Sequence, residues 1–412
     1  MSTLASQPLV SIQPRLRREI VFGPAERKAG RIVHHAKDCF TRQFFRLGER
    51  EHFLFTRMDG HTTLPEIEAA YRQKFRKRLD DRAWGQIFSL AAQKHLLEGQ
   101  TSVSELEDIK EAVAKKGRTG GLLALRLPLL QPEPLLQKLM PVFRLFTKPG
   151  VAGAGLAAIF LLQCWIALRW NLLQADMNVL HHEHWPWFWW VFGAFLMAAA
   201  ICHEIAHGLT CKYFGGEVPE MGVVFRYLLF FPYCRIDDVV LFDKKAHRIW
   251  TALAGAYISL LLLVPFYFVW TASQPGTPVR VFCAALFTIY DGLCLLNLVP
   301  FVQLDGYYAL SYLLWCPDLR ADSYAYWKAH LLRPFGRAAK AFSCTSKEAA
   351  IYLFYGLISA AVTAFLLLTA VRHWTAYFTG WFGTFWGIAA MLAITIAILG
   401  AKRIQTAIVK LR

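Results

Sequence analysis

Closely spaced cysteines are missing from this sequence, although its 412 residues include nine cysteines. No two of them are close enough for the short Cys-x-x-Cys spacing of thiolate zinc sites, and their number is odd. This excludes a disulfide framework and a cysteine-based zinc site as organising features. We expect most of the thiols to be buried as small apolar groups. Cys211 is a possible exception that could reach a metal bound by His207, because it lies four residues after His207 and a helix would place both on one face.

Acidic residues are also scarce, with 29 Asp and Glu against 45 Lys and Arg and a formal net charge of +16. Hydrophobic residues make up 56% of the chain, which is typical of a membrane protein and not of a soluble enzyme. The long apolar runs follow Gly150, whereas residues 1–148 are polar and basic. Cytoplasmic loops and anionic lipid account for the basic surplus, so we expect no nucleic-acid partner.

The first 19 residues contain no apolar core of a signal peptide, so we expect the N-terminal part to stay on the side where it is made. A membrane crossing takes about 20 apolar residues. Six segments meet that requirement: 150–169, 187–211, 249–271, 280–304, 349–371 and 381–401. The loop 171–185 has no Lys or Arg, whereas the stretches 212–248 and 320–347 are rich in both. The positive-inside rule therefore predicts cytoplasmic N- and C-termini.

The most specific motif is His203-Glu204-Ile205-Ala206-His207, at the end of the second predicted span. Residues four apart share a helix face, so both imidazoles can bind one Zn²⁺ while Glu204 can act as a general base. The simpler alternative is a polar helix end that reaches the membrane interface. His181, His182 and His184 lie in the loop on the opposite side of the membrane, so they are expected not to share this zinc.

The fourth predicted span ends in a second polar group. Asn297 is followed by Pro300 and then by Asp305-Gly306. Pro300 would break the helix, and Asp305 would supply an oxygen ligand at the depth of the two histidines. Asp291, further into this span, is either functional or paired with a polar group of a neighbouring span.

The motifs His203-Glu204-x-x-His207 and Asn297-x-x-Pro300-x-x-x-x-Asp305-Gly306 together resemble those of the site-2 protease family of intramembrane zinc metalloproteases. The run from Asp305 to Ser311, followed by Pro317 to Arg320, is similar to the bacterial "peptide zinc metalloprotease" branch. The resemblance implies one Zn²⁺ bound by His203, His207 and Asp305, with Glu204 as the catalytic base and Asn297 in substrate binding. It also implies a location in a bacterial inner membrane. Within the third predicted span, the stretch Ala254 to Ser259 departs from the Gly-Pro and later Asn that are typical of the family.

In that mechanism zinc lowers the pKa of a bound water and polarises the scissile carbonyl, and Glu204 transfers the proton to the leaving amine. We expect residues 215–240 to form strands that present an extended peptide. The alternative is a non-proteolytic, zinc-containing component for peptide binding or export. A third hypothesis is a metal transporter. Glu204 argues against it, because this residue lies where a hydrolytic enzyme needs a general base.

The N-terminal region predicts a small winged-helix-like α+β domain at 29–100. Residues 31–35 and 40–47 are strand-like around a turn at 36–38. Helices are expected over 49–58, from the capping box Thr63-Leu64-Pro65-Glu66, and after Asp80 or Asp81. The run from Phe44 to Glu51 with Met58-Asp59-Gly60-x-Thr62 resembles the precursor-peptide-binding domain of coenzyme PQQ biosynthesis, which implies capture of a leader peptide as an extra strand. The basic residues between Arg72 and Arg78 have two further interpretations: a structural or membrane-facing basic patch, or a DNA-binding surface.

We therefore expect a polytopic α-helical membrane protein with about six transmembrane helices and a cytoplasmic winged-helix-like domain. The predicted boundaries are a tail at 1–28, the domain at 29–100, a linker at 101–149 with an amphipathic stretch near 122–140 on the bilayer surface, a metalloprotease domain at 150–401 and a basic tail at 402–412. The expected partners are a peptide or membrane-protein substrate, the lipid bilayer and a peptide exporter or secretion adaptor.

Overall fold

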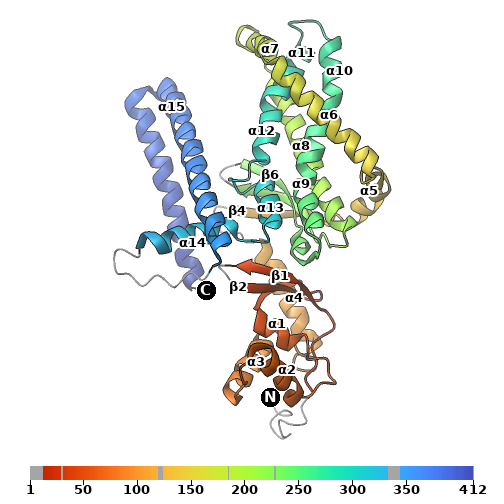
Figure 1. Ribbon diagram of the computed structural model, residues 1–412. Helices are drawn as coiled ribbons and strands as arrows, with labels where there is room; N and C mark the ends of the chain where they lie inside the picture. Colours follow the sequence, from red (N-terminus) through yellow and green to blue (C-terminus); the bar gives the residue numbers. More distant parts are fainter. Residues whose placement is uncertain are drawn as a thin grey trace. The chain divides into compact units, whose positions relative to one another are not determined.

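The computed structural model describes residues 13–28, 31–118, 124–183, 185–226, 229–332 and 344–411. Two compact units make up the chain (Figure 1). The N-terminal unit takes in residues 1–117 with the short segments 240–243 and 338–348, and the membrane unit takes in 118–239, 244–337 and 349–412. All nine cysteines are free thiols, but only four of them (Cys211, Cys283, Cys294 and Cys316) are buried, so the expectation that most of the thiols are buried is wrong.

A three-stranded antiparallel sheet opens the N-terminal unit. Its order is β1 (Ile20–Lys28), β2 (Arg31–Asp38) and β3 (Gln43–Gly48). The predicted hairpin is present as β2 and β3, but its turn lies at 39–42 and not at 36–38. Asp38 fixes this turn, because its carboxylate accepts the backbone N–H groups of Phe40 and Thr41.

Strand β1 was not predicted, because residues 20–28 were assigned to an N-terminal tail. Gly23-Pro24 within this segment is a turn signal in the sequence. In the structure the register shifts between Phe22 and Ala25, so a β-bulge accommodates the two residues within the strand. The tertiary pairing with β2 therefore overrides the local turn preference.

Four helices follow the sheet: α1 (Glu49–Phe55), α2 (Leu64–Phe75), α3 (Asp81–Gln93) and α4 (Val103–Arg118). Glu66 accepts the backbone N–H of Thr63 at 2.8 Å, and Asp80 accepts that of Ala83 at 2.8 Å, so both predicted helix starts are confirmed. The helices cover a continuous apolar core with the sheet, whose most buried members include Ala36, Leu47, Leu54, Phe55, Ile67 and Leu96.

Five helical segments of the described chain are long and apolar enough to cross a membrane. They are α6 (Pro149–Leu168), α8 (Phe188–Tyr213), α9 (Lys245–Leu261) with α10 (Val264–Ala272), the segment Pro278–Asn297, and Ser346–Ala376 of α15 (Ser346–Leu411). The sixth predicted span, 381–401, falls within α15 but beyond the side chains that the structure describes. This is the architecture expected of a polytopic helical membrane protein.

The fourth span is shorter than predicted and is not one regular helix. It consists of α11 (Pro278–Ala285), the π-helix η3 (Leu286–Tyr290) and α12 (Asp291–Asn297). It ends at Asn297 and not at residue 304, because Pro300 cannot continue the helix. A turn then leads to α13 (Asp305–Leu313).

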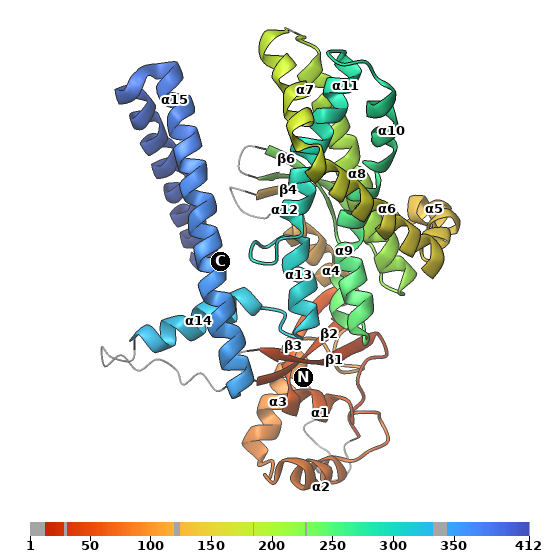
Figure 2. The same ribbon diagram turned by 45° about the horizontal axis from the view of Figure 1, so that its top comes forward.

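A second antiparallel sheet, of order β4-β5-β6, lies in the membrane unit (Figure 2). It is formed by β4 (Ala124–Leu130), β5 (Met221–Arg226) and β6 (Leu229–Cys234). The strands expected within 215–240 are thus confirmed. The amphipathic stretch expected near 122–140 is corrected, because its first part is β4 and only its second part enters the helix α5 (Glu133–Phe146). Pairing with β5 satisfies the backbone groups on one edge of β4.

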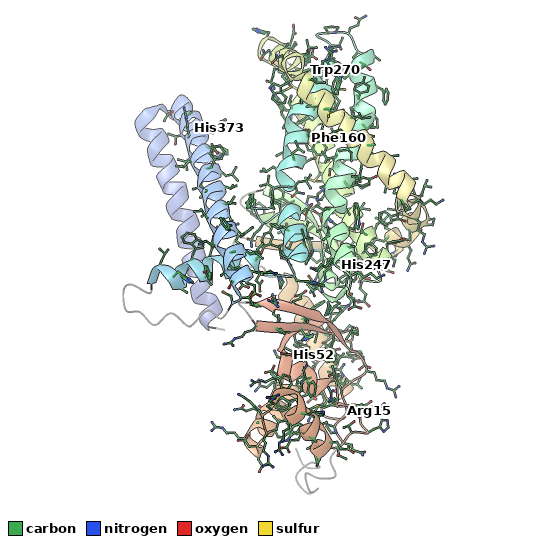
Figure 3. The ribbon with its side chains drawn as sticks, in the orientation of Figure 1. Arg15, His52, Phe160, His247, Trp270 and His373 are labelled. Carbon is green, nitrogen blue, oxygen red and sulfur yellow. The ribbon has the colours of Figure 1, made fainter. Side chains whose placement is uncertain are left out.

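The remaining elements are α7 (Trp170–His182), the 3₁₀ helix η2 (Asp237–Leu241) and α14 (Leu319–Leu332). Most of the loop expected at 171–185 is therefore the helix α7. Figure 3 shows Trp270 and His247 at opposite ends of the helices of the membrane unit. At the Trp270 end, Asp176 accepts hydrogen bonds from the Trp270 indole at 2.9 Å and from Arg280 Nε at 3.0 Å. This buried cluster ties α7, α10 and α11 together.

Candidate metal centre

Helix α8 carries both histidines of the first motif on one face. The Nε2 atoms of His203 and His207 are 3.1 Å apart. His207 is buried, and His203 is partly buried. Both residues belong to the second half of α8, towards the end of the unit where His247 lies. The i, i+4 spacing thus brings the two rings together as predicted.

Asp305 completes a group of three. Its Oδ2 atom lies 3.1 Å from His203 Nε2 and 3.3 Å from His207 Nε2. Within the described residues, these three side chains form the group that can hold a metal ion. Two ligands bonded to a tetrahedral zinc at about 2.0–2.1 Å are separated by about 3.3 Å. The spacing of the three donor atoms is therefore compatible with a tetrahedrally coordinated metal ion.

The other ring nitrogens are already occupied. His207 Nδ1 lies 2.7 Å from the carbonyl oxygen of Thr251, and His203 Nδ1 lies 3.0 Å from Ser259 Oγ. A carbonyl only accepts, so His207 Nδ1 carries the hydrogen, and in the neutral ring the Nε2 lone pair is left facing Asp305. Converging acceptor atoms of this kind require a shared proton or a cation. A metal site with oriented histidines has this donor pattern.

Helix α9 presents a stripe of small residues to the two histidines. Thr251, Gly255 and Ser259 are spaced four apart, so they share one face of the helix. A Cβ atom built on Gly255 would collide with Nε2 of both His203 and His207. Glycine is therefore needed here to leave room at the donor atoms. The sequence prediction assigned these three residues no role, although their i, i+4, i+8 spacing was a usable signal.

Asn297 holds the carboxylate of the second motif. Its Nδ2 atom donates to Asp305 Oδ2 at 2.7 Å and lies 3.4 Å from His203 Nε2. Asn297 is the last residue of α12, and Asp305 is the first of α13. The helix break at Pro300 thus lets both side chains of the motif meet.

Glu204 is the fifth residue of the predicted site. Its carboxylate interacts electrostatically with His203, His207 and Asp305, and the backbone N–H of Cys234 is directed at it. Cys234 is the last residue of β6. The described part of the chain therefore brings an acidic side chain, the three donors and the end of one strand to one place.

Two groups outside the spans show the local electrostatics. Burial alone would raise the pKa of Asp305, but its contacts with His203 and His207, in the state where those rings are protonated, lower it below its ordinary value. The Asp305 carboxylate is therefore the charged partner of the pair of rings. On β6, burial and the nearby Glu220 raise the pKa of Tyr233 to about 12.

Other candidate ligands lie away from the three donors. Cys211 is buried, and its Sγ atom is 4.0 Å from the carbonyl oxygen of Glu217. Asp291 is buried and accepts a hydrogen bond from Gln163 Nε2 at 2.7 Å, which is the structural pairing weighed above. His182 is exposed at the end of α7, and the side chains of His181 and His184 lie outside the described residues.

In comparisons with known proteins, no family model, no curated protein and no solved structure matches this chain.

Proposed function

We propose that this protein is a membrane-embedded zinc metalloendopeptidase. The observation that carries the proposal is the convergence of His203, His207 and Asp305 at zinc-like spacing, with Glu204 beside them. A bound Zn²⁺ would lower the pKa of a water ligand and polarise a peptide carbonyl. The site-2 protease resemblance of the two motifs supports the same activity.

The residues of the chain have separate roles in this proposal. His203, His207 and Asp305 hold the metal, and Thr251 fixes the His207 ring through its carbonyl oxygen. Glu204 is placed to accept the proton of the attacking water and to pass it to the leaving amine. Asn297 orients Asp305. Its proposed part in substrate binding requires only that its second donor hydrogen reach a peptide carbonyl.

Strand β6 is the proposed docking edge for the substrate. One edge of β6 pairs with β5, and among the described residues no strand pairs with the other edge. The strand contains Pro232, a residue tolerated at sheet edges and not in central strands. Because Cys234 reaches Glu204, an extended peptide added beside β6 would pass the candidate centre.

The N-terminal unit is proposed to select the substrate. Within residues 20–93, three strands are followed by the helices α1, α2 and α3, and this order fits the predicted winged-helix-like domain. Among the described residues β3 pairs only with β2, so its second edge can accept a leader-peptide strand. A ribosomally made precursor peptide is the proposed substrate, with an exporter or secretion adaptor as a further partner.

The proposed location is a bacterial inner membrane, with both termini in the cytoplasm. The Lys and Arg residues that follow α8 and α13 support this orientation, since they gather on one side of the predicted spans. The candidate centre then lies towards the cytoplasmic side of the membrane.

The proposal is tested by co-expressing a precursor peptide encoded beside this gene with the wild-type protein or with Glu204→Gln. Mass spectrometry of the peptide then reports cutting. We expect a defined fragment with the wild-type protein and intact peptide with the variant. Zinc content, measured by mass spectrometry of the purified proteins, should stay close to one per chain in both, because Glu204 is not a ligand.

Two controls separate the alternatives. An intact peptide in both samples, with zinc and peptide binding confirmed, would support the binding or export component. Deletion of residues 1–100 tests the leader-capture role. Cleavage that keeps its rate and its selectivity after this deletion contradicts that role.

A further inference from the structure

Metal binding at His203 would decide which of His203 and Ser259 is the donor in the hydrogen bond between them. His203 offers Nε2 to Asp305 and His207, and Nδ1 lies 3.0 Å from Ser259 Oγ. When Nε2 binds a metal, the remaining ring hydrogen sits on Nδ1. The ring must then donate to Ser259, and the hydroxyl hydrogen of Ser259 is left to find another acceptor.

Tyr290 offers such an acceptor from another helix. Its side chain is only 7% exposed, and no hydrogen bond of good geometry reaches its hydroxyl within the described residues. This hydroxyl interacts with the side chains of Ser259, Cys294 and Cys202. A buried hydroxyl without a partner costs about 1–3 kcal/mol. Among these neighbours Ser259 carries a hydroxyl, and the same hydroxyl lies 3.0 Å from His203 Nδ1.

The π-helix sets the face of the fourth span that carries Tyr290. Tyr290 is the last residue of η3, and one π turn shifts the helix face relative to a continuous α-helix. After this turn, Tyr290, Cys294 and Asn297 follow at spacings of four and three, so they share one face. Asn297 on that face contacts His203 and Asp305. The same register leaves Asp291 to pair with Gln163.

Packing holds the Tyr290 ring in place. The ring meets Phe195 of α8 edge-to-face, with centroids 5.7 Å apart. Phe195 and His203 are eight residues apart on α8, so the ring is anchored to the helix that carries the histidine. The hydroxyl is therefore presented from a fixed position, as a positioning group requires.

We propose that Ser259 and Tyr290 form a two-hydroxyl outer shell that fixes the tautomer and orientation of the His203 ring for metal binding. Both are positioning residues, since neither would touch the metal or the substrate. The inference rests on the proposed zinc site. Outer-shell partners of metal-binding histidines change metal affinity by about 10- to 100-fold when they are removed.

The test uses the full-length protein in detergent and the variants Ser259→Ala, Tyr290→Phe and the double variant. Zinc affinity is measured by competition with a coloured chelator, and the visible spectrum of the Co²⁺-substituted protein reports ligand geometry. Thr288→Val is the matched control. It removes a hydroxyl from the same π turn whose hydrogen bond goes to the carbonyl oxygen of Ala284 in its own helix.

We expect zinc affinity to fall by about tenfold in Tyr290→Phe and by more in Ser259→Ala. The Co²⁺ spectrum should shift in both, and Ser259→Thr should restore it. The double variant should resemble Ser259→Ala, because Tyr290 acts through Ser259. Thr288→Val should leave affinity and spectrum unchanged.

A Tyr290→Phe protein with wild-type zinc affinity and Co²⁺ spectrum overturns the inference while leaving the zinc site intact. If the wild-type protein and an Asp305→Ala variant bind zinc equally, the zinc site itself is wrong, and the outer shell fails with it. The two failures are therefore distinguishable.

Discussion

The amide of Asn297 donates a hydrogen bond of 2.7 Å to the carboxylate of Asp305. The two residues are eight positions apart and lie on different helices, α12 and α13. The oxygen that accepts this hydrogen bond, Oδ2, is also the one that lies 3.1 Å from His203 Nε2 and 3.3 Å from His207 Nε2. The contact with Asn297 therefore fixes which carboxylate oxygen faces the two rings. Asn297 therefore supports a metal ligand directly, whatever part it has in substrate binding.

Replacing Asn297 by leucine should lower zinc affinity by about 10- to 100-fold, because Asp305 loses the group that orients it. Leucine keeps the approximate shape of the side chain and removes both polar atoms. Chelator competition on the purified protein measures the effect. Unchanged affinity would show that Asp305 is held by its backbone alone and would leave Asn297 with a role in substrate binding only.

Gly255→Ala should abolish zinc binding or reduce it severely. The added Cβ would collide with the Nε2 atoms of His203 and His207, so the rings must rotate out of the donor geometry. Gly292→Ala is the control, because a Cβ at that position in the fourth span has nothing within 4 Å. Zinc content of the two purified variants makes the comparison. Equal zinc content would contradict the close packing of α9 against the centre.

Asp176→Ala should destabilise the membrane unit by about 3 kcal/mol, because it leaves Arg280 without its buried partner. The Trp270 indole loses its acceptor in the same change. Thermal unfolding in detergent should show a midpoint several degrees lower. Glu183→Ala, an exposed position just after α7, should leave the midpoint unchanged. Similar midpoints for both variants would mean that the cluster does not hold these helices together.

Acidification should weaken the N-terminal unit through His52. Burial, with added positive charge from His34 and Lys74, lowers the pKa of His52 to about 4. The unfolded chain takes up this proton near pH 6.5, and the folded chain does so only near pH 4. The stabilisation is therefore complete above about pH 6.5 and is lost as the pH falls towards 4.

Because His52 is half-buried, solvent screening reduces this effect to about 1 kcal/mol. Hydrogen exchange of β2 and α1 in the full-length protein, corrected for the intrinsic effect of pH, measures it. His52→Gln should flatten the pH dependence. A wild-type protein equally protected at pH 7 and pH 5 would be inconsistent with the lowered pKa.

The sequence by itself determined the features that depend on neighbours along the chain. The i, i+4 spacing of His203 and His207 places both on one helix face, and Pro300 ends the helix before Asp305. Runs of about 20 apolar residues mark the spans. Thr63 and Glu66 predict the start of α2 in the same way, because the two capping residues are only three positions apart.

Only the tertiary structure decided which groups surround these residues. Ser259 is 56 positions from His203, and Thr251 is 44 positions from His207, so no local pattern pairs them. Strand β4 was assigned to an amphipathic stretch on the bilayer surface, because the sequence does not show which segment will pair with its backbone groups, and in the structure that segment is β5. Hydrogen-bond partners and sheet edges are set by packing between distant segments, and that packing is what the linear order of residues does not contain.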